Sequence, residues 1–264
     1  MLVLGLDTTT RVGSCALVRD GVVVHERASN PQISHAEHLP GDLMALLDAA
    51  GVGLDAIDVF GVAVGPGSFT GLRVGIATMQ GLAFATKRPL IGVSALDALA
   101  HVAQRPCGPV ASAASRTPAA SVGRALPGSP GGPDKVLPNA AAPVRLATWI
   151  DAWRGEVYAA LYENGREVEP ASVEHPDSIL SRLSERGGLR NVCFIGDGAQ
   201  SFAQRIRDAG GHLAEPVSPL IAAAIAQIAD ACALAGDRPG PEDIRPLYVR
   251  RTDAELARDA RHDR

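Results

Sequence analysis

The residues best suited to chemistry in this sequence gather where strands are predicted to end. Asp7 follows an apolar stretch, residues 2–6, and is followed directly by Thr8, Thr9 and Thr10. A carboxylate at the end of a buried strand, beside hydroxyl groups, can hold a hydrated metal ion and phosphate oxygens. The same residues can equally cap the amides of their own turn. The sequence leaves both interpretations open.

A second candidate element is a glycine-rich turn. Residues 59–64 are apolar and β-branched, which predicts a buried strand that ends at Gly65, followed by a sharp turn through Pro66 and Gly67. Ser68 is a good N-cap, so a helix begins there and its positive end could face an anion. The spacing is neither a GxGxxG nor a Walker loop. A turn with nothing bound fits the same pattern.

Together, the two elements outline a possible nucleotide cleft. Its candidate residues are Asp7, Thr8, Thr9, Gly65, Gly67 and Ser68. Because no complete phosphate-binding motif is present, ATP is only a weak expectation here and no cofactor is predicted. We also name no catalytic residue, since the sequence offers no convincing base, nucleophile or metal cluster.

Two histidines stand at the start of another predicted helix. Ser34 and Glu37 form a capping box for this helix, which runs to Gly51, and His35 and His38 lie in its first turn. A metal site needs a third and a fourth ligand, and nothing nearby supplies them. We therefore predict no metal and expect histidines that face solvent or an interface.

The helix after Ser68 contains glycines in its interior. Gly71 and Gly75 are four residues apart, while Ala77, Gly81 and Ala85 repeat that interval on a neighbouring face. Each interior glycine costs about 1 kcal/mol relative to alanine, so the close approach of another backbone must offset the cost. The spacing does not decide whether that backbone belongs to the chain's own sheet or to a second protein.

Composition sets broad limits on function. The chain has 264 residues, 46% of them hydrophobic, a net charge of −4 and a pI of about 6.0. There is no overall basic field to attract nucleic acid, so any role with RNA should be indirect. No signal peptide or run of about 18 apolar residues is present, which predicts a cytoplasmic protein. The four scattered cysteines are expected to be buried thiols.

Two halves of the sequence share the same order of elements. Asp7 precedes the hairpin signal Asp20-Gly21 by 13 residues, and Asp151 precedes Asn164-Gly165 by the same 13. Residues 192–195 then run into a second glycine turn, 196–198, as residues 59–64 run into the first. The repetition predicts a duplicated unit of strands, hairpin and helix.

These signals divide the chain into four parts. We predict an N-terminal subdomain at 1–104, a Pro-, Ala- and Gly-rich insert or linker at 105–143, a C-terminal subdomain at 144–251, and a charged tail at 252–264. An alanine-rich amphipathic helix over 219–234 is expected to pack on the second sheet.

A duplicated α/β unit with an acid at the end of each first strand resembles the actin-like ATPase superfamily, with its RNase H-like halves. The stretches GLDTTT, HAEHLP, GPGSFTGLRVGIATMQGLA, GVSALDALA, IDAWRGEVYAALY and PLYVR resemble the bacterial TsaB family, once called YeaZ and grouped with the M22 glycoproteases. The resemblance covers both halves, without the insert and the tail.

The resemblance implies a non-catalytic subunit in the synthesis of tRNA N6-threonylcarbamoyladenosine at position 37. It implies pairing with the related catalytic subunit TsaD, with the ATPase TsaE joining them, a homodimer when alone, and contact with tRNA only through the complex. The family pairs through the helices that begin near His35 and Ser68. The implied interface residues are His35, His38, Leu39, Gly71, Arg73, Gly75, Thr78, Met79 and Leu82.

Two features depart from the family. Trp153 stands where the family usually has an arginine, which puts an anionic contact there in doubt, although Arg154 is in place. The insert at 105–143 is not typical. An autonomous ATPase or small-molecule kinase that uses Asp7 and Asp151 is the alternative function, and a peptidase, the older assignment of the family, would need a metal.

Overall fold

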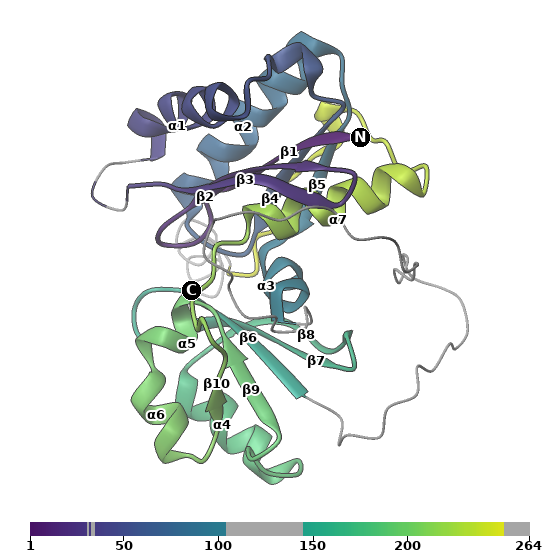
Figure 1. The fold of residues 1–264 in the computed structure, drawn as a ribbon. Helices are drawn as coiled ribbons and strands as arrows, with labels where there is room; N and C mark the ends of the chain where they lie inside the picture. The colour runs from purple at the N-terminus through teal and green to yellow at the C-terminus, as the bar shows by residue number, and fades with distance from the viewer. Residues whose placement is uncertain (31, 33–34, 104–144, 251–264) are drawn as a thin grey trace, which may run out of the picture.

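The structure of this 264-residue chain is a computed structural model that describes residues 1–30, 32, 35–103 and 145–250. Each of its two lobes is built on one mixed β-sheet (Figure 1). The predicted insert at 105–143, the predicted tail at 252–264 and the Ser34 half of the predicted capping box lie outside the described residues.

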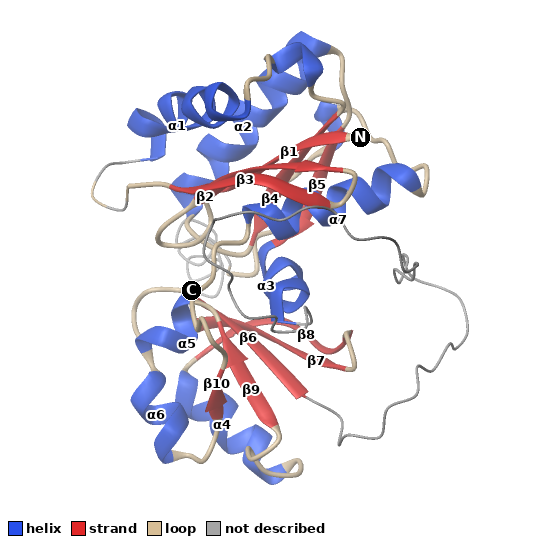
Figure 2. Cartoon of the chain, viewed as in Figure 1, coloured by secondary structure: helices blue, strands red, loops and turns tan. Residues whose placement is uncertain are grey.

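The first lobe contains a five-stranded sheet in the order β3-β2-β1-β4-β5. The strands are β1 (Leu2–Asp7), β2 (Ser14–Arg19), β3 (Val22–Ala28), β4 (Val59–Gly65) and β5 (Leu90–Ser94). Helices α1 (His35–Ala50) and α2 (Phe69–Thr86) cover its outer face, and the short 3-10 helix η1 (Leu54–Ala56) precedes β4 (Figure 2). The predicted strand, turn and helix around Gly65 are confirmed.

The second lobe repeats this arrangement, with the strand order β8-β7-β6-β9-β10. Its strands are β6 (Arg145–Asp151), β7 (Val157–Glu163), β8 (Arg166–Glu174), β9 (Val192–Ile195) and β10 (His212–Leu213). Helices α4 (Pro176–Glu185), α5 (Asp197–Ser201) and α6 (Ala203–Asp208) pack on one face. In both sheets the first strand pairs antiparallel with the second and parallel with the fourth. This shared topology confirms the predicted duplication.

Both predicted hairpins form with the same turn chemistry. Asp20 and Gly21 have φ angles of 51° and 76°, and Asn164 and Gly165 have φ angles of 51° and 78°. Two consecutive residues with positive φ are the requirement of a type I′ turn, whose twist matches that of the paired strands.

The alanine-rich helix α7 (Ala222–Leu234) packs on the first sheet, so the prediction that it covers the second sheet is wrong. Strands β1 and β4 carry glycines, Gly5 and Gly61, where α7 crosses them. A Cβ at Gly61 would come within 2.9 Å of the Ala229 Cβ. The helix can approach this closely because the strands carry glycines where it crosses them and α7 carries the small side chains of Ala226 and Ala229.

The end of the chain also returns to the first lobe. After α7, the 3-10 helix η2 (Pro241–Asp243) packs on α2, and the Leu247 amide donates to the Val64 carbonyl at 2.7 Å. The predicted C-terminal subdomain of 144–251 is therefore wrong from residue 222 onward, because residues 222–249 pack on the first lobe and complete it.

Helix α3 (Ala95–Ala103) joins the two lobes. It contacts α7 and β4 on one side and β6 and β7 on the other, within one continuous apolar core. The Tyr162 hydroxyl of β7 donates to Asp97 of α3 at 2.5 Å. Burial, followed by the neighbouring Asp97 charge, raises the pKa of Tyr162 above its usual range. The hydroxyl therefore keeps its proton and the contact persists.

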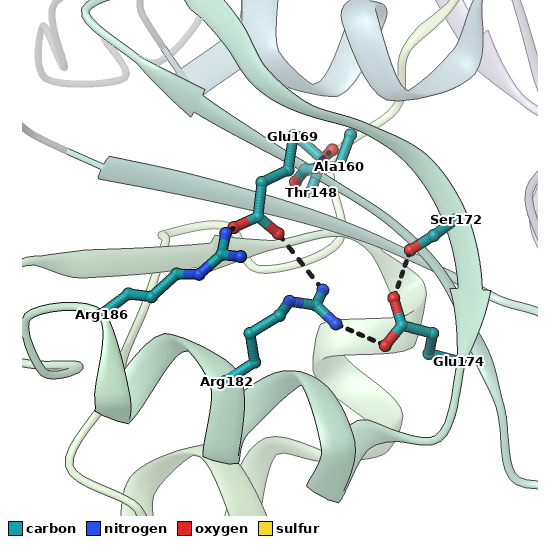
Figure 3. Close-up of polar contacts among 7 residues, drawn as sticks. All are labelled: Thr148, Ala160, Glu169, Ser172, Glu174, Arg182 and Arg186. Atoms are coloured by element: carbon teal, nitrogen blue, oxygen red, sulfur yellow. Dashed lines mark hydrogen bonds and ion pairs between the residues drawn. The ribbon is translucent and has the colours of Figure 1, made fainter.

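An ion-pair network ties α4 to β8 in the second lobe (Figure 3). Arg182 contacts Glu174 at 2.5 Å and Glu169 at 3.2 Å, and Arg186 contacts Glu169 at 2.7 Å. Arg182 lies between the two carboxylates, and Ser172 donates to Glu174 at 2.7 Å. The network holds the helix against the edge strand.

Within the described ranges, no helix is both long and apolar enough to cross a membrane. Three of the four cysteines are described, and all three are free thiols. Cys15 is buried, whereas Cys193 and Cys232 are half-buried, and Cys107 lies outside the described residues.

Candidate functional site

The loop after β1 uses the Asp7 carboxylate for its own structure. Asp7 is buried, and its Oδ1 accepts from the Thr9 amide at 2.7 Å and from the Thr9 hydroxyl at 2.6 Å. Its Oδ2 accepts from the Thr10 hydroxyl. Both oxygens are thus engaged within four residues of chain, which is the turn cap that the sequence left open beside metal binding.

The glycine turn folds onto this loop. The Ser68 amide donates to the Thr9 carbonyl at 2.9 Å, and a Cβ at Gly67 would overlap that carbonyl. The Ser68 hydroxyl accepts from the Gly71 amide at 3.2 Å, so the predicted N-cap forms. Asp7, Thr9, Gly67 and Ser68 therefore lie together, and the hydrogen bonds described above join these residues to one another or to Gly71; nucleotide binding by them stays a prediction.

Helix α2 presses its glycines against the same loop. The Thr8 hydroxyl donates to the Gly71 carbonyl at 2.8 Å. A Cβ at Gly75 would overlap Thr8 Oγ1 and would lie 3.2 Å from both Thr8 Cβ and Cγ2. Gly71 and Gly75 are buried, and they serve the chain's own loop. Their predicted role as contacts to a partner helix is wrong.

Two further predicted interface residues are also buried inside the first lobe. Leu39 is 1% exposed and Met79 is 0% exposed, and both belong to the core between the helices and the sheet. A residue on the inner face of an amphipathic helix cannot also reach a partner. The family resemblance implied an interface role for these two side chains, but both lie on the inner faces of their helices.

The remaining predicted interface residues differ in exposure. Arg73 is exposed, and Thr78 and Leu82 are half-buried. His38 Nδ1 lies 2.8 Å from Asp42 Oδ2, so this side chain turns toward its own helix. The side chain of His35 lies outside the described residues. These assignments stay predictions.

Asp197 is a functional candidate that the sequence analysis missed. Its Oδ2 accepts from the Arg11 amide of the first lobe at 2.9 Å, and its Oδ1 accepts from the Asp151 amide of the second lobe at 3.0 Å. One carboxylate thus bridges the two loops that face each other across the lobes. The sequence does contain a signal that could have pointed to Asp197. This acid stands between two glycines, at the position that corresponds to Gly65-Pro66-Gly67 in the first repeat.

The environment of Asp197 perturbs its titration. The residue is 8% exposed, and this burial raises the pKa of its carboxyl above the usual range. The two amide donors oppose the shift, while the charges of Asp7 and Asp151 add to it. The structure therefore gathers three carboxylates near the loop ends.

A cavity of about 380 Å³ lies between the lobes, beside this loop cluster. Its lining comes from the start of α2 with the turn before it, from the loop after β6 with the start of β7, and from the C-terminal segment. The aromatic residues of the lining are Phe69, Trp153, Tyr158 and Tyr248. Sequence reasoning did not find this cavity, because its walls come from three segments that only the fold brings together.

The comparisons with known proteins agree with this architecture. A family model described as TsaD, tRNA N6-adenosine threonylcarbamoyltransferase, matches residues 21–120. The tRNA threonylcarbamoyladenosine biosynthesis protein TsaB of Escherichia coli strain K12 is 30% identical over 257 residues, which cover 95% of this chain and 95% of that protein. The chain belongs to the TsaB family.

Two solved structures from Pseudomonas aeruginosa share the fold of this chain. An uncharacterized protein from Pseudomonas aeruginosa with similarity to peptidase YeaZ has a TM-score of 0.67 and 28% identity, covering 94% of this chain and 99% of that one. YeaZ from Pseudomonas aeruginosa gives a TM-score of 0.64 with the same identity and coverage. The predicted duplicated α/β fold is confirmed by the two five-stranded sheets and by the likeness to YeaZ.

Proposed function

We propose that this TsaB-family chain is a non-catalytic subunit in tRNA N6-threonylcarbamoyladenosine biosynthesis, acting at position 37 through a TsaD-type catalytic partner. The name of its relative, 30% identical over nearly the full length, supports this role. The TsaD family model matches residues 21–120, which include α1 and α2. The proposed partner is therefore a relative with a similar pair of helices, and the tRNA substrate implies a cytoplasmic site of action.

The observation that carries the non-catalytic role is the engagement of Asp7 in its own turn. Its Oδ1 accepts from Thr9 and its Oδ2 accepts from Thr10, so a metal ion at this carboxylate would compete with the hydrogen bonds of the turn. Breaking a buried hydrogen bond without a replacement costs about 1–3 kcal/mol. We propose that the partner subunits bind the ATP and supply the chemistry.

The pairing surface we propose is the outward side of α1 and α2, called here the α1/α2 surface. It comprises Gly41, Met44, Ala77, Gly81 and Phe84. Met44 is 58% exposed and Phe84 is 77% exposed, and a Cβ at Gly41 or Gly81 would contact nothing within 4 Å. The two helices lie side by side on the first sheet (Figure 1).

This surface combines exposed apolar side chains with small residues, which lets the backbone of another helix approach closely. The face of α2 that carries Ala77 and Gly81 thus takes the place of Gly71 and Gly75 as the proposed contact. The same surface can pair with a second copy when the chain is alone, because a two-fold dimer uses one patch twice. TsaE is proposed to join the heterodimer.

The direct test is reconstitution of the tRNA modification. We expect threonylcarbamoyladenosine to form when the TsaD-type subunit, the TsaE-type ATPase and this chain are present, and to be lost when this chain is left out. Full modification without this chain would contradict the proposal. The Gly81→Arg variant should fail in the same assay, with Ala209→Arg, on the exposed end of α6, as its control.

One observation favours the alternative, an autonomous ATPase or kinase. Asp7, Asp151 and Asp197 lie close enough between the lobes for their charges to interact. Calorimetry of the isolated chain with Mg-ATP separates the two functions. We expect no turnover, and micromolar binding with turnover would favour the enzyme.

A further inference from the structure

A groove of about 520 Å³ lies at the C-terminal end of α2. One wall comes from the last turns of this helix and the residues after it, and the other comes from the segment that follows α7. The lining consists of Ala83, Phe84, Lys87, Arg88, Pro89 and residues 238–242. None of these residues lines the cavity between the lobes, which lies at the opposite end of α2. The groove is therefore a separate surface feature.

Hydrogen bonds hold both walls of the groove in place. The Gln80 side chain of α2 donates to the Pro241 carbonyl at 2.8 Å, and the Leu90 amide donates to the Pro239 carbonyl at 3.4 Å. On the other wall, Lys87 ends α2 with a φ angle of 56°, and its amide donates to carbonyls of the preceding turn. The walls are thus ordered before any ligand arrives, which lowers the entropy cost of binding.

Positive charges dominate the lining of this groove. Its cations are Lys87, Arg88 and Arg238, and among the described residues it has one carboxylate, that of Glu242. Within the part of the chain that the structure describes, the side chains of Lys87 and Arg88 form no hydrogen bond or ion pair. Arg238 donates to the Ala233 carbonyl at 3.3 Å, which is a neutral acceptor. We call this feature the basic groove.

Helix dipoles account for only part of this arrangement. A cation near the C-terminus of a helix is stabilised by the dipole, which suits Lys87 and Arg88 after α2 and Arg238 after α7. The dipoles do not explain why the two helix ends share one groove with an aromatic ring that is 77% exposed, that of Phe84. Apolar surface beside uncompensated charge is typical of a protein-binding site.

We propose that the basic groove binds an acidic segment of the protein that pairs on the α1/α2 surface. Phe84 belongs to both features, so a partner that covers this ring also reaches the groove. The chain as a whole has a net charge of −4, and the groove is a local region that attracts carboxylates. Complementary charges at the edge of an interface speed association and fix its orientation. The inference rests on the proposed function and adds the chemistry of the partner.

The first test uses the scarcity of lysine. The chain has two lysines, Lys87 and Lys135, and Lys135 lies outside the described residues. A carbodiimide activates a carboxylate, and a lysine amine then displaces the activating group as a urea and forms an amide without a spacer. In the complex with the TsaD-type partner, we expect mass spectrometry to find Lys87 joined to Asp or Glu residues of one partner segment. A complex that forms without this crosslink would overturn the inference and leave the proposed function intact.

The second test removes the charges of the groove. The double variant Lys87→Asn/Arg88→Gln lacks two cations, and asparagine tolerates the left-handed backbone at position 87. We expect calorimetry to show about fivefold weaker pairing in low salt. The difference should vanish in about 1 M salt, where the Debye length is about 3 Å. Wild-type affinity of the double variant in low salt would overturn the inference.

A matched control lies on the second lobe. Arg190 and Arg207 are exposed there, and Arg190→Gln/Arg207→Gln removes the same two charges. This variant should pair as the wild type does. An equal loss in both double variants would mean that net charge alone sets the affinity, and would overturn the assignment to the groove. Thermal unfolding of each variant separates lost pairing from lost folding.

The same experiments distinguish this inference from the proposed function. Pairing of the wild-type chain with the TsaD-type protein, measured by calorimetry, is the requirement that both share. Its absence would overturn the proposed function and this inference with it. Pairing that is unaffected by the loss of Lys87 and Arg88 would overturn the inference alone.

Discussion

Gly75 of α2 lies directly against Thr8 of the β1 loop, with no space for a methyl group between them. The Thr8 hydroxyl meanwhile donates to the Gly71 carbonyl, one turn earlier in α2. The inner glycines of the helix therefore fix it to its own lobe. Ala77 and Gly81, on another face of the helix, are exposed and belong to the proposed α1/α2 surface.

Replacement of Gly75 by alanine should destabilise the isolated chain. A Cβ would overlap Thr8 Oγ1, and rotation of Thr8 gives no relief because its Cβ and Cγ2 lie at 3.2 Å. Overpacking of this kind costs about 1–3 kcal/mol. Urea unfolding of Gly75→Ala should show a lower midpoint with an unchanged slope.

Gly81 provides the matched control for this change. It lies in the same helix, and a Cβ there would meet nothing within 4 Å. Gly81→Ala should therefore raise the free energy of unfolding by about 1 kcal/mol, the helix-propensity difference between the two residues. Equal effects of both substitutions would contradict the assignment of the two faces.

Asp197 should give the chain a measurable pH dependence. Its pKa is raised in the folded state by burial, so the folded protein holds this proton more tightly than the unfolded chain does. The stability from this group is fully present below its unfolded pKa of about 3.9 and is lost as the pH rises through the folded value.

The comparison with Asp197→Asn isolates this effect. The amide cannot titrate, and its NH₂ group would face one of the two backbone donors, those of Arg11 and Asp151. We expect the variant to be less stable than the wild type at low pH and the difference to shrink as the pH rises. Parallel stability curves from pH 4 to pH 7 would show that Asp197 does not titrate as proposed.

The network on α4 should stabilise the second lobe modestly. Arg182 is 30% exposed and contacts both Glu169 and Glu174, so Arg182→Gln should cost about 1 kcal/mol at neutral pH. Its contact lowers the pKa of Glu174. The contribution is therefore present above the unfolded pKa of about 4.3 and should fade as the pH falls through the folded value.

Arg186 is the control for that network. Among the described residues its side chain has one ion-pair partner, Glu169, and it is 59% exposed, so Arg186→Gln should have a smaller effect than Arg182→Gln. Thermal unfolding in low and high salt checks both variants, because salt screens exposed pairs more strongly. A larger effect at Arg186 would show that the bridging position of Arg182 contributes little.

Much of the fold could be predicted from the sequence because its signals are local. The hairpin dipeptide at Asp20-Gly21, the N-cap at Ser68 and the apolar runs that become β1 and β4 each depend on neighbouring residues. The repeated order of elements then indicated the duplication. Features that depend on a residue's immediate neighbours could therefore be predicted from the sequence.

The errors concern contacts between distant segments. Nothing local in α7 tells which sheet it covers, and the clue was the pair of glycines, Gly5 and Gly61, in strands of the first lobe. Likewise, the interval between Gly71 and Gly75 predicts that another backbone approaches the helix closely, but it does not identify that backbone. The cavity and the bridge through Asp197 also join segments that only the folded chain brings together.

The measurement that tests the central claim most directly is the affinity of this chain for the proposed TsaD-type partner. Gly81→Arg adds a long charged side chain to the α1/α2 surface at a position where the fold has room. We predict that calorimetry or gel filtration will show at least a hundredfold loss of pairing for Gly81→Arg, with unchanged folding, and wild-type pairing for Ala209→Arg. Wild-type affinity in a folded Gly81→Arg variant would contradict the account.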